Sequence, residues 1–233
     1  MAERIAVTGA SGVVGAATVR SLLARGDAVV GVQRGTVPES LQRAGATGQS
    51  ADITGPIEEL QRAFIGCDAV VHAAARVDMT GPWEDFERVN VHGTRNVLQA
   101  ARLAGVRTFV MVSSPSVAHA GHPLVGAGAG RADPDRARSH YARSKAMAEL
   151  LALEADGLDL AVAVVRPHLV WGVGDSQLTA RIIDRARAGR LVVIGSGAAL
   201  IDTTYVDNAG DAIAAAVQRA HIDGVHGHPL VVS

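Results

Sequence analysis

Short apolar runs alternate with longer stretches of helical periodicity from one end of the chain to the other. Most of the apolar runs are β-branched or alanine-rich throughout, which is typical of parallel strands covered by helices on both faces. The pattern predicts strands at residues 5–7, 29–33, 69–72, 107–112, 160–165 and 191–194, and helices at residues 13–25, 56–64, 83–104, 139–155, 175–188 and 207–219. Alternating units of this kind predict an α/β fold with a doubly wound parallel sheet.

Length and charge narrow the class further. A chain of 233 residues is long enough for one large α/β domain and too short for two full ones. Its 22 basic and 23 acidic residues give a formal net charge of -1, and no basic stripe offsets that balance, so we expect no nucleic-acid partner. Residues 108–130 lack charge, but prolines, histidines and glycines interrupt them, so we expect a buried strand and a loop there, with no membrane span.

Cysteine content bears on metal sites and on the compartment. Cys67 is the only cysteine, which excludes an intrachain disulfide and a paired-cysteine metal site. The first residues also lack the apolar stretch of a secretory signal. We therefore expect no metal and a cytoplasmic protein.

A glycine-rich turn, residues 8–15 (TGASGVVG), follows the first predicted strand and opens the first predicted helix. Gly9, Gly12 and Gly15 would allow a tight turn, close approach of a pyrophosphate to backbone N–H groups, and close packing of helix on strand. The start of the helix would add positive potential for the phosphates. Glycine-rich turns also occur without ligands, but this strand–turn–helix context favours a dinucleotide site.

Two further positions bear on the nucleotide. An acid at the end of the second strand would accept hydrogen bonds from the adenine ribose of NAD, but this chain has Gln33 followed by Arg34. A guanidinium there can pair with a 2′-phosphate, so NADP is favoured over NAD, unless Arg34 is only a solvated surface residue. Asp52 could accept from the adenine amino group, or serve only as a loop or capping carboxylate.

Tyr141 and Lys145 lie four residues apart, which places them on one face of a predicted helix. Tyrosine has a reference pKa of about 10 and is a poor base at neutral pH. An ammonium beside the ring, with an oxidised nicotinamide close by, favours the phenolate. The phenol could then exchange a proton with an alcohol or ketone oxygen. This spacing is common by chance, and it gains weight from lying downstream of the phosphate loop.

Three serines, Ser113, Ser114 and Ser116, follow the strand predicted at residues 107–112. A serine at the carboxyl end of such a strand faces the crevice where open α/β sheets bind ligands, and it could hold a substrate oxygen against Tyr141. Spacing does not choose among the three. For at least two of them the remaining role is a turn hydroxyl that caps the backbone.

The order of these motifs resembles that of the extended short-chain dehydrogenase/reductases, of the NAD-dependent epimerase/dehydratase superfamily. The motifs are residues 8–15, Asp52, 72–75 (HAAA), 90–94 (NVHGT), 113–114 (SS), 141–145 (YARSK), 166–167 (RP) and 205–208 (YVDN). Within that superfamily the chain looks most similar to the 3β-hydroxysteroid dehydrogenase and sterol-4α-carboxylate 3-dehydrogenase branch, on residues 202–208 (DTTYVDN) and 114–117 (SPSV). The second match implies that Ser114 is the catalytic serine.

The resemblance implies a Rossmann fold, NAD(P) as cofactor, and Ser114, Tyr141 and Lys145 as the catalytic group. It also implies that Asn90 braces the site, that alanines line the cofactor cleft, and that Pro167 and His168 lie by the nicotinamide. The alternatives are core packing for the alanines, helix capping for Asn90 and a structural role for His168. The predicted cofactor-binding set is Gly9, Ser11, Gly12, Val13, Val14, Gly15, Arg34, Asp52, Ile53, Ala73, Ala74, Ala75, Asn90, Val112, Tyr141, Lys145, Pro167 and His168.

Relatives in that branch continue beyond the position of Ser233. We therefore expect residues 1–233 to form an NAD(P)-binding Rossmann domain, in which residues 168–204 contribute to an incomplete C-terminal substrate lobe. Helices equivalent to those at residues 83–104 and 139–155 form a four-helix dimer interface in relatives, which implies a homodimer.

The resemblance implies an oxidoreductase that interconverts a secondary alcohol and a ketone on a hydrophobic substrate, sterol-like or a 3-hydroxy/3-keto acid. A nucleotide-sugar epimerase is the nearest alternative, but it would keep NAD tightly bound, which Gln33 and Arg34 do not favour. A sugar dehydratase needs an Asp–Glu pair after the catalytic hydroxyl, and residues 115–117 (PSV) carry no carboxylate. A non-catalytic NADP-binding redox sensor is also considered; the intact catalytic group argues against it and the short chain argues for it.

Overall fold

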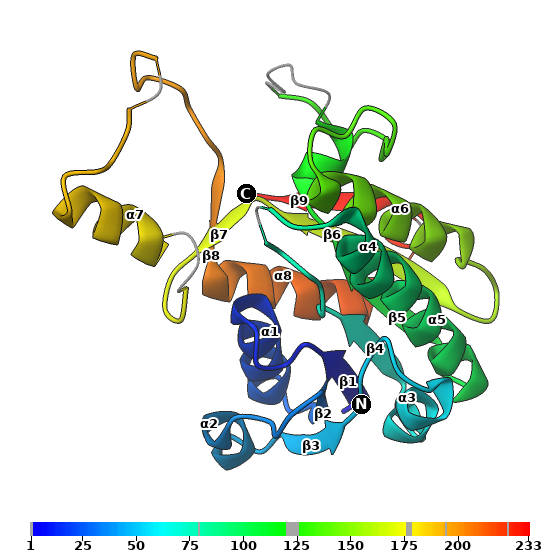
Figure 1. The fold of residues 1–233 in the computed structure, drawn as a ribbon. Coiled ribbons are helices and arrows are strands. Elements are labelled where there is room, and N and C mark those ends of the chain that lie inside the picture. Colours follow the sequence, from blue (N-terminus) through cyan, green and yellow to red (C-terminus); the bar gives the residue numbers. More distant parts are fainter. Residues whose placement is uncertain (1, 79, 120–125, 176–178, 194, 223) are drawn as a thin grey trace.

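A seven-stranded parallel sheet in the order β3-β2-β1-β4-β5-β6-β9 forms the centre of the molecule (Figure 1). The computed structural model describes residues 2–78, 80–119, 126–175, 179–193, 195–222 and 224–233. The sheet strands are β1 (Arg4–Thr8), β2 (Ala28–Gln33), β3 (Thr47–Ser50), β4 (Ala69–His72), β5 (Thr108–Val112), β6 (Ala161–Pro167) and β9 (Pro229–Val232). All neighbouring pairs are parallel, which confirms the predicted sheet.

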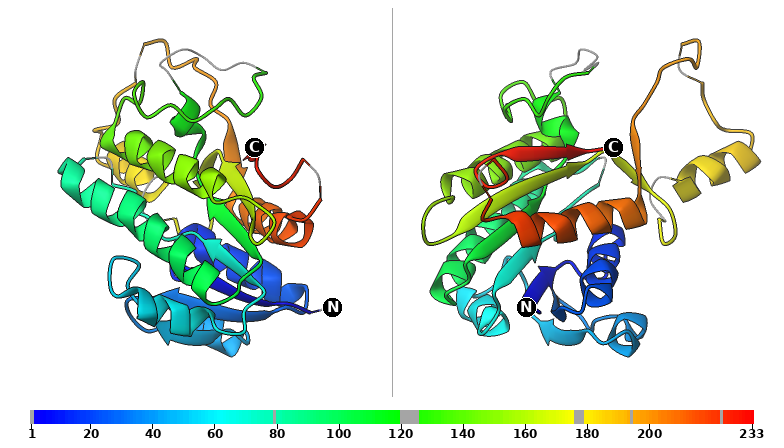
Figure 2. Two further views of the ribbon diagram at one scale, coloured as in Figure 1. Left: turned by 90° about the vertical axis from the view of Figure 1, so that its right-hand side faces the viewer. Right: turned by 180° about the vertical axis from the view of Figure 1, so that it is seen from behind.

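Helices cover both faces of the sheet, as Figure 2 shows from two sides. One buried cluster joins the sheet to α1 (Val13–Ala24), α2 (Glu39–Arg43) and α8 (Val206–Arg219). The other joins it to α3 (Ile57–Phe64), α5 (Gly93–Leu103) and α6 (His140–Glu154). Because both faces are buried, β1, β4, β5 and β6 consist mainly of apolar residues, which is the pattern that made them predictable.

The predicted helix at residues 83–104 is divided into three parts. It begins as α4 (Trp83–Phe86), continues as a π-helical segment, η1 (Glu87–His92), and ends as α5. π-helical turns are rare and are found frequently at functional sites. Sequence periodicity gave no sign of this one.

The chain turns back at the middle of the sheet. From β1 it proceeds outward to β2 and β3, and then crosses to β4 on the other side of β1. The loops after β1 and β4 therefore diverge at the carboxyl edge of the sheet. Open α/β sheets bind ligands at such a reversal point.

One predicted strand is wrong, and four strands were not predicted. Residues 191–193 form no strand; Leu191, Val192 and Val193 are exposed, so this apolar run does not mark a buried strand, and residue 194 lies outside the described residues. The polar edge strand β3 is exposed along its length and gives no apolar signal. The other unpredicted strands are β9, β7 (Leu169–Trp171) and β8 (Thr203–Tyr205).

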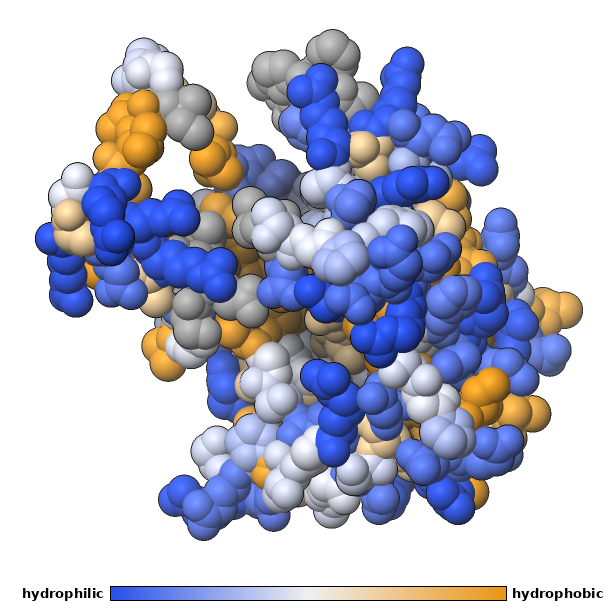
Figure 3. All heavy atoms as spheres, viewed as in Figure 1, coloured by the Kyte–Doolittle hydropathy of each residue, from blue (hydrophilic) through white to orange (hydrophobic). Residues whose placement is uncertain are grey.

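Residues 169–175, 179–193 and 195–205, which together we call the arm, extend away from the sheet (Figure 1). At its base β7 and β8 form a separate two-stranded parallel sheet, and α7 (Thr179–Arg187) lies farther out with no buried residue. Apolar residues are exposed along the arm, as Figure 3 shows, with Val192 at 80% and Leu200 at 101% exposure. The arm thus presents apolar surface that the described chain does not cover.

Candidate active site

The turn between β1 and α1 is shaped for close approach by another group. Gly9 has φ +69°, and a Cβ there would lie 2.8 Å from the Ala74 backbone. A Cβ on Gly15 would lie 2.1 Å from the Gly9 carbonyl oxygen. Helix α1 begins after Gly12 with no side-chain cap and no acid in its first turn, so its positive end is not neutralised by the protein. These features fit the pyrophosphate of a dinucleotide.

Gln33 and Arg34 lie where β2 ends. The Gln33 amide Nε2 donates to the Thr36 carbonyl, while Gln33 Oε1 is buried and has no hydrogen-bond partner in the described chain. Arg34 is exposed, and a hollow of about 430 Å³ opens beside it between residues 34–37 and β3. A buried acceptor without a partner carries a free-energy cost, which a ligand hydroxyl would remove. These residues fit the ribose end of a dinucleotide.

Asp52 and Ile53 have local structural roles. Asp52 Oδ1 accepts hydrogen bonds from the Thr54 backbone N–H at 2.8 Å and the Thr54 hydroxyl at 2.9 Å, which fixes the turn before α3. Ile53 is buried and packs against Gly93 at the start of α5. This is the loop role considered for Asp52, and an adenine contact through either residue stays a prediction.

Lys145 is the only lysine in the chain, and it lies buried on α6 with 4% exposure. Its Nζ donates to the Val112 carbonyl at the end of β5, at 2.6 Å. Burial lowers the pKa of the ammonium from 10.5 to about 8, and the nearby Glu149 carboxylate acts in the opposite direction. Lys145 is thus a titratable cation beside the carboxyl end of β5.

Tyr141 lies one turn before Lys145 on α6, which begins after Ser139, whose hydroxyl accepts from the Ala142 N–H at 3.1 Å. Burial raises the pKa of the phenol, and a hydrogen bond with Ser114 lowers it. A phenol in these surroundings needs additional positive charge nearby before it can act as a base.

The three serines have different neighbours. Ser113 is buried and donates to Glu149 Oε2 at 2.6 Å, away from Tyr141. Ser114 precedes the short 3-10 helix η2 (Pro115–Ala118), and its hydroxyl lies 2.9 Å from the Ser116 hydroxyl and near enough to Tyr141 to lower the pKa of the phenol. The serine that the resemblance implied is therefore the one beside the phenol, and Ser116 is its immediate neighbour.

Asn90 sits inside the π-helical segment and connects two elements. Its Nδ2 donates to Ser144 Oγ at 2.8 Å and to the Arg76 carbonyl at 3.1 Å, and its Oδ1 accepts from the Arg76 N–H at 2.7 Å. It therefore joins α6 to the loop after β4 and does not cap a helix end. The expected cofactor contact of Asn90 stays a prediction.

A buried polar network below the crevice was not foreseen. His72 Nδ1 lies 2.8 Å from the Thr8 hydroxyl and His72 Nε2 lies 3.0 Å from the Thr94 hydroxyl. Burial, with the Lys145 charge second, lowers the pKa of His72 to about 3, so its imidazole is neutral at ordinary pH. The sequence signal was a histidine at the end of an otherwise apolar strand. This network fixes the ends of β1 and β4 to α5.

The remaining predicted residues lie at the carboxyl edge of the sheet. Ala73–Ala75 follow β4, and the Ala74 N–H donates to the Thr8 hydroxyl at 3.3 Å. Pro167 ends β6, and the His168 N–H donates to the Val232 carbonyl of β9 at 2.8 Å. The Gly9 turn and the Ser114 loop lie at this same carboxyl edge of the sheet. The Val112 carbonyl, at the end of β5, accepts the hydrogen bond from Lys145 there.

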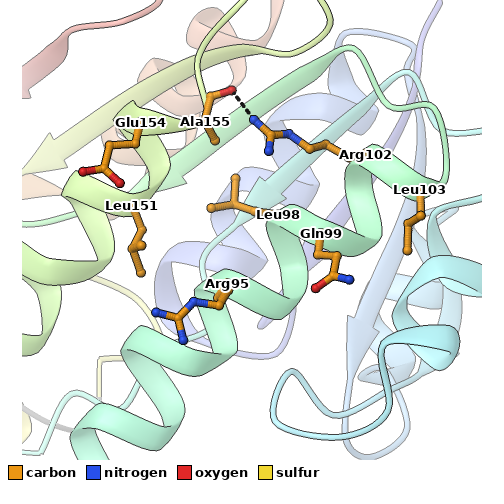
Figure 4. A pocket seen from close by; sticks show the side chains of 8 residues that line it. All are labelled: Arg95, Leu98, Gln99, Arg102, Leu103, Leu151, Glu154 and Ala155. Atoms are coloured by element: carbon orange, nitrogen blue, oxygen red, sulfur yellow. Dashed lines mark hydrogen bonds between the residues drawn. The ribbon is translucent and has the colours of Figure 1, made fainter.

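A groove between α5 and α6 lies on the outer surface of the molecule (Figure 4). It has a volume of about 540 Å³, and Leu98, Leu103 and Leu151 contribute apolar surface to it. Arg102 extends across one end and donates to the Ala155 carbonyl at 2.9 Å. None of the predicted catalytic residues lines this groove, so it is separate from the candidate active site.

In the described residue ranges, no helix combines the length and the apolar character that a membrane span needs. Within the same ranges, no three His, Cys, Asp or Glu residues are grouped so that they could hold a metal ion.

The glycine-rich turn at residues 8–15, the parallel sheet, and the reversal of strand order between β1 and β4 define a dinucleotide-binding protein of the Rossmann type. The chain belongs to the NAD dependent epimerase/dehydratase family, whose model matches residues 5–232.

Two curated relatives extend this comparison. The chain is 40% identical over 208 residues to a 2-alkyl-3-oxoalkanoate reductase of Stenotrophomonas maltophilia, covering 88% of this chain and 62% of that protein. It is 34% identical over 215 residues to a 3-beta-hydroxysteroid dehydrogenase of Mycolicibacterium neoaurum, covering 88% of this chain and 57% of that protein. The chain therefore spans only about three fifths of the length of these relatives.

A solved structure agrees with the fold. It is a dTDP-glucose 4,6-dehydratase from Streptomyces venezuelae, a double mutant of DesIV with NAD bound. The TM-score is 0.81 at 27% sequence identity, and the match covers 98% of this chain and 75% of that one. The predicted Rossmann fold and the resemblance to the 3β-hydroxysteroid dehydrogenase branch are confirmed.

Proposed function

We propose that the protein is an NAD(P)-dependent oxidoreductase that interconverts a secondary alcohol and a ketone on a hydrophobic substrate. The observation that carries the proposal is that the Ser114 hydroxyl lies near enough to Tyr141 to lower the pKa of its phenol, with Lys145 one helical turn away, at the carboxyl edge of the sheet where the glycine-rich turn lies. A purely structural protein has no need of a buried lysine one helical turn from a half-buried tyrosine, because burying an ammonium costs free energy.

Each residue of this group has a role in proton transfer. When bound, the nicotinamide ring donates or accepts the hydride. The Ser114 hydroxyl orients the substrate oxygen toward the phenol, and Tyr141 gives a proton to that oxygen in reduction or takes one from it in oxidation. The positive charge of Lys145 favours the phenolate that remains after reduction, and its N–H groups are available for the ribose of the cofactor.

The substrate class follows from the arm and from the relatives. The arm presents exposed apolar side chains, among them Trp171, Ile182 and Leu200, and it follows β6 at the carboxyl edge of the sheet. The relatives are named for a 2-alkyl-3-oxoalkanoate and for a 3-beta-hydroxysteroid. We assign residues 168–204 to a substrate lobe, which further residues complete in longer members of the family. We propose a 3-oxo acid or a sterol-like ketone as the substrate.

Chain length gives the test of this proposal. This chain should bind NADPH but reduce a bulky 2-alkyl-3-oxoalkanoate or 3-oxosteroid with low kcat/KM, because remote binding energy positions the reacting carbon. A form extended beyond Ser233 with the segment of a longer relative should reduce at least one of them with a higher kcat/KM. Absence of ketone reduction by both forms, with NADPH bound, would contradict the proposed activity. Equally high activity of the two forms would contradict the proposal that the substrate lobe of this chain is incomplete.

For the cofactor we propose NADP in preference to NAD. Exposed Arg34, beside the hollow at the end of β2, can pair with a 2′-phosphate. A charge-assisted hydrogen bond contributes about 1.5–3 kcal/mol. NADPH should therefore bind roughly tenfold or more tightly than NADH.

Arg34→Ala should remove this preference while leaving NADH affinity nearly unchanged, as measured by fluorescence titration at moderate salt. Arg43→Ala, an exposed arginine on nearby α2 that is paired with Glu39, is the matched control and should keep the preference. Equal affinity of the unmutated chain for NADPH and NADH would refute the assignment.

We also propose that two copies associate through α5 and α6. The groove of Figure 4 is apolar at Leu98 and Leu151, and Leu103 on its edge is 55% exposed. Arg95 on α5 and Glu154 on α6 lie on opposite helices of the groove. A two-fold axis can therefore place Arg95 of one copy opposite Glu154 of the other, and the reverse.

Leu103→Asp should convert the dimer to a monomer in light-scattering measurements, because it buries a charge in an apolar interface. Ile65→Asp alters a similarly exposed residue outside the groove and should leave the mass unchanged. A monomeric unmutated chain at high concentration would exclude this interface.

A further inference from the structure

A buried ion pair lies behind the catalytic group. Glu149 on α6 is 0% exposed and Arg166 on β6 is 1% exposed. Arg166 Nε donates to Glu149 Oε2 at 2.9 Å, and its NH2 group donates to Oε1. Ser113 Oγ donates to Glu149 Oε2 at 2.6 Å, and Arg166 NH1 donates to the Gly130 carbonyl at 2.8 Å. Four segments that are distant in sequence are thus joined by one pair of charges.

Three consecutive residues, Val112 at the end of β5 and the two serines after it, each lie near a residue of α6, and the three α6 residues are spaced one turn apart. The Val112 carbonyl accepts from Lys145, the Ser113 hydroxyl donates to Glu149, and the Ser114 hydroxyl lies near enough to Tyr141 to lower the pKa of its phenol. Glu149 therefore fixes the same register between helix and strand that brings Ser114 to Tyr141.

Stability alone does not account for the pair. Taking both charges out of water carries a desolvation penalty that can exceed their mutual attraction, and replacing such pairs by well-packed apolar residues is often neutral or stabilising. A buried pair gives a fixed, directional geometry that apolar packing does not. Both Glu149 oxygens are used, and Arg166 donates through three of its nitrogens.

We propose that Glu149, held by Arg166, is a positioning residue that sets the Ser114–Tyr141–Lys145 geometry and connects it to the loop at Gly130. This inference rests on the proposed oxidoreductase function for its kinetic consequence only. Glu149 touches no substrate atom in this scheme and acts through Ser113 and Lys145. Arg166 pairs with the Glu149 carboxylate, which is fully buried.

The pair also acts on Lys145 through its charge. Among the described residues, the ionisable groups coupled to Lys145 by charge are His72 on β4 and Glu149 on α6, and Tyr141 lies one turn before it on α6. From β5 it meets the Val112 carbonyl, and from η1 neutral Asn90 binds the adjacent residue Ser144. Arg166 on β6 reaches it only through Glu149. His72 is neutral, so Glu149 is the anion that keeps the pKa of Lys145 from falling further.

The first experiment titrates Lys145 directly. Because the chain has one lysine, selective 13C labelling of lysine gives a single side-chain NMR signal. Glu149→Gln removes the charge but keeps an oxygen for Ser113, so the midpoint of this titration should move to lower pH than in the unmutated protein. Thr108→Val is the matched control: it removes a buried hydrogen bond to His221 at the other end of β5 and should not move the midpoint.

The second experiment separates positioning from folding. The double variant Glu149→Leu with Arg166→Met replaces both charges by apolar residues, and its melting temperature should equal or exceed that of the unmutated chain. Its kcat for NADPH-dependent reduction of a 2-alkyl-3-oxoalkanoate should nevertheless fall about 10²-fold, with Kd for NADPH nearly unchanged, because small displacements at the reacting centre are costly. Should Glu149→Gln fail to fold, the Lys145 titration is made on the double variant.

The outcomes are distinct from those that test the proposed function. An unmoved Lys145 midpoint together with an unchanged kcat in a folded variant overturns this inference. If the unmutated and extended chains both lack ketone reduction, the proposed function fails. In that case a moved midpoint still supports the role of Glu149 toward Lys145, and an unmoved one overturns it.

Discussion

Tyr141→Phe should reduce kcat for ketone reduction by roughly 10²–10⁴-fold, the range expected when a general acid or base is lost. The ring and its packing against α6 remain, so the Kd for NADPH and the melting temperature should change little. The physical reason is the missing proton: Ser114 stays near the ring, but an aliphatic hydroxyl is a far weaker acid than a phenol. Steady-state kinetics with a 2-alkyl-3-oxoalkanoate, on the extended chain, provide the measurement.

The serines supply the comparison for this result. Ser114→Ala should also slow turnover, and Ser116→Ala should do so less, because Ser116 reaches the phenol only through Ser114. If Ser116→Ala were the more damaging change, the assignment of the loop would be wrong by two residues. A Tyr141→Phe variant with full activity would exclude the proton transfer proposed here.

The sheet could be predicted because its signal is local. β1, β4, β5 and β6 are apolar nearly throughout, and each of these strands is buried on both faces. The same rule failed at residues 191–193, which are equally apolar but exposed, because an apolar run does not state what covers it. It also missed β3, since an exposed polar edge strand is held by backbone pairing with β2 and needs no apolar side chains.

In the candidate site, too, the features that could be predicted are those whose residues lie close together in the sequence. Gly9, Gly12 and Gly15, and the Tyr141–Lys145 spacing, belong to single turns, so their placement could be predicted from neighbours in sequence. Choosing among the serines needed the resemblance, because the choice depends on which hydroxyl faces α6. The Glu149–Arg166 pair could not be predicted, because the partners lie on different elements and only the packing of α6 on β6 brings them together.

Lys145→Met should weaken cofactor binding and reduce turnover together, which distinguishes it from Tyr141→Phe. Methionine matches the length of the side chain but supplies neither a charge to lower the phenol pKa nor N–H groups for the ribose. With the proton-transfer effect of Tyr141 included, kcat should fall by at least the roughly 10²-fold expected for losing acid–base catalysis. Loss of affinity without loss of kcat would separate Lys145 from the chemistry.

The lowered pKa of Lys145 predicts how NADPH binding should change with pH. The folded pKa of Lys145 lies at about 8, below the ordinary 10.5, so the ammonium is present below pH 8 and is lost as pH rises through that value. Binding of NADPH that uses the ammonium should therefore weaken above about pH 8 in the unmutated chain, whereas binding to Lys145→Met should show no such step. Since Lys145 is the only lysine, the midpoint of its NMR titration can be compared directly with the pH dependence of NADPH binding. A binding curve that is flat through the measured midpoint would show that the cofactor does not depend on this charge.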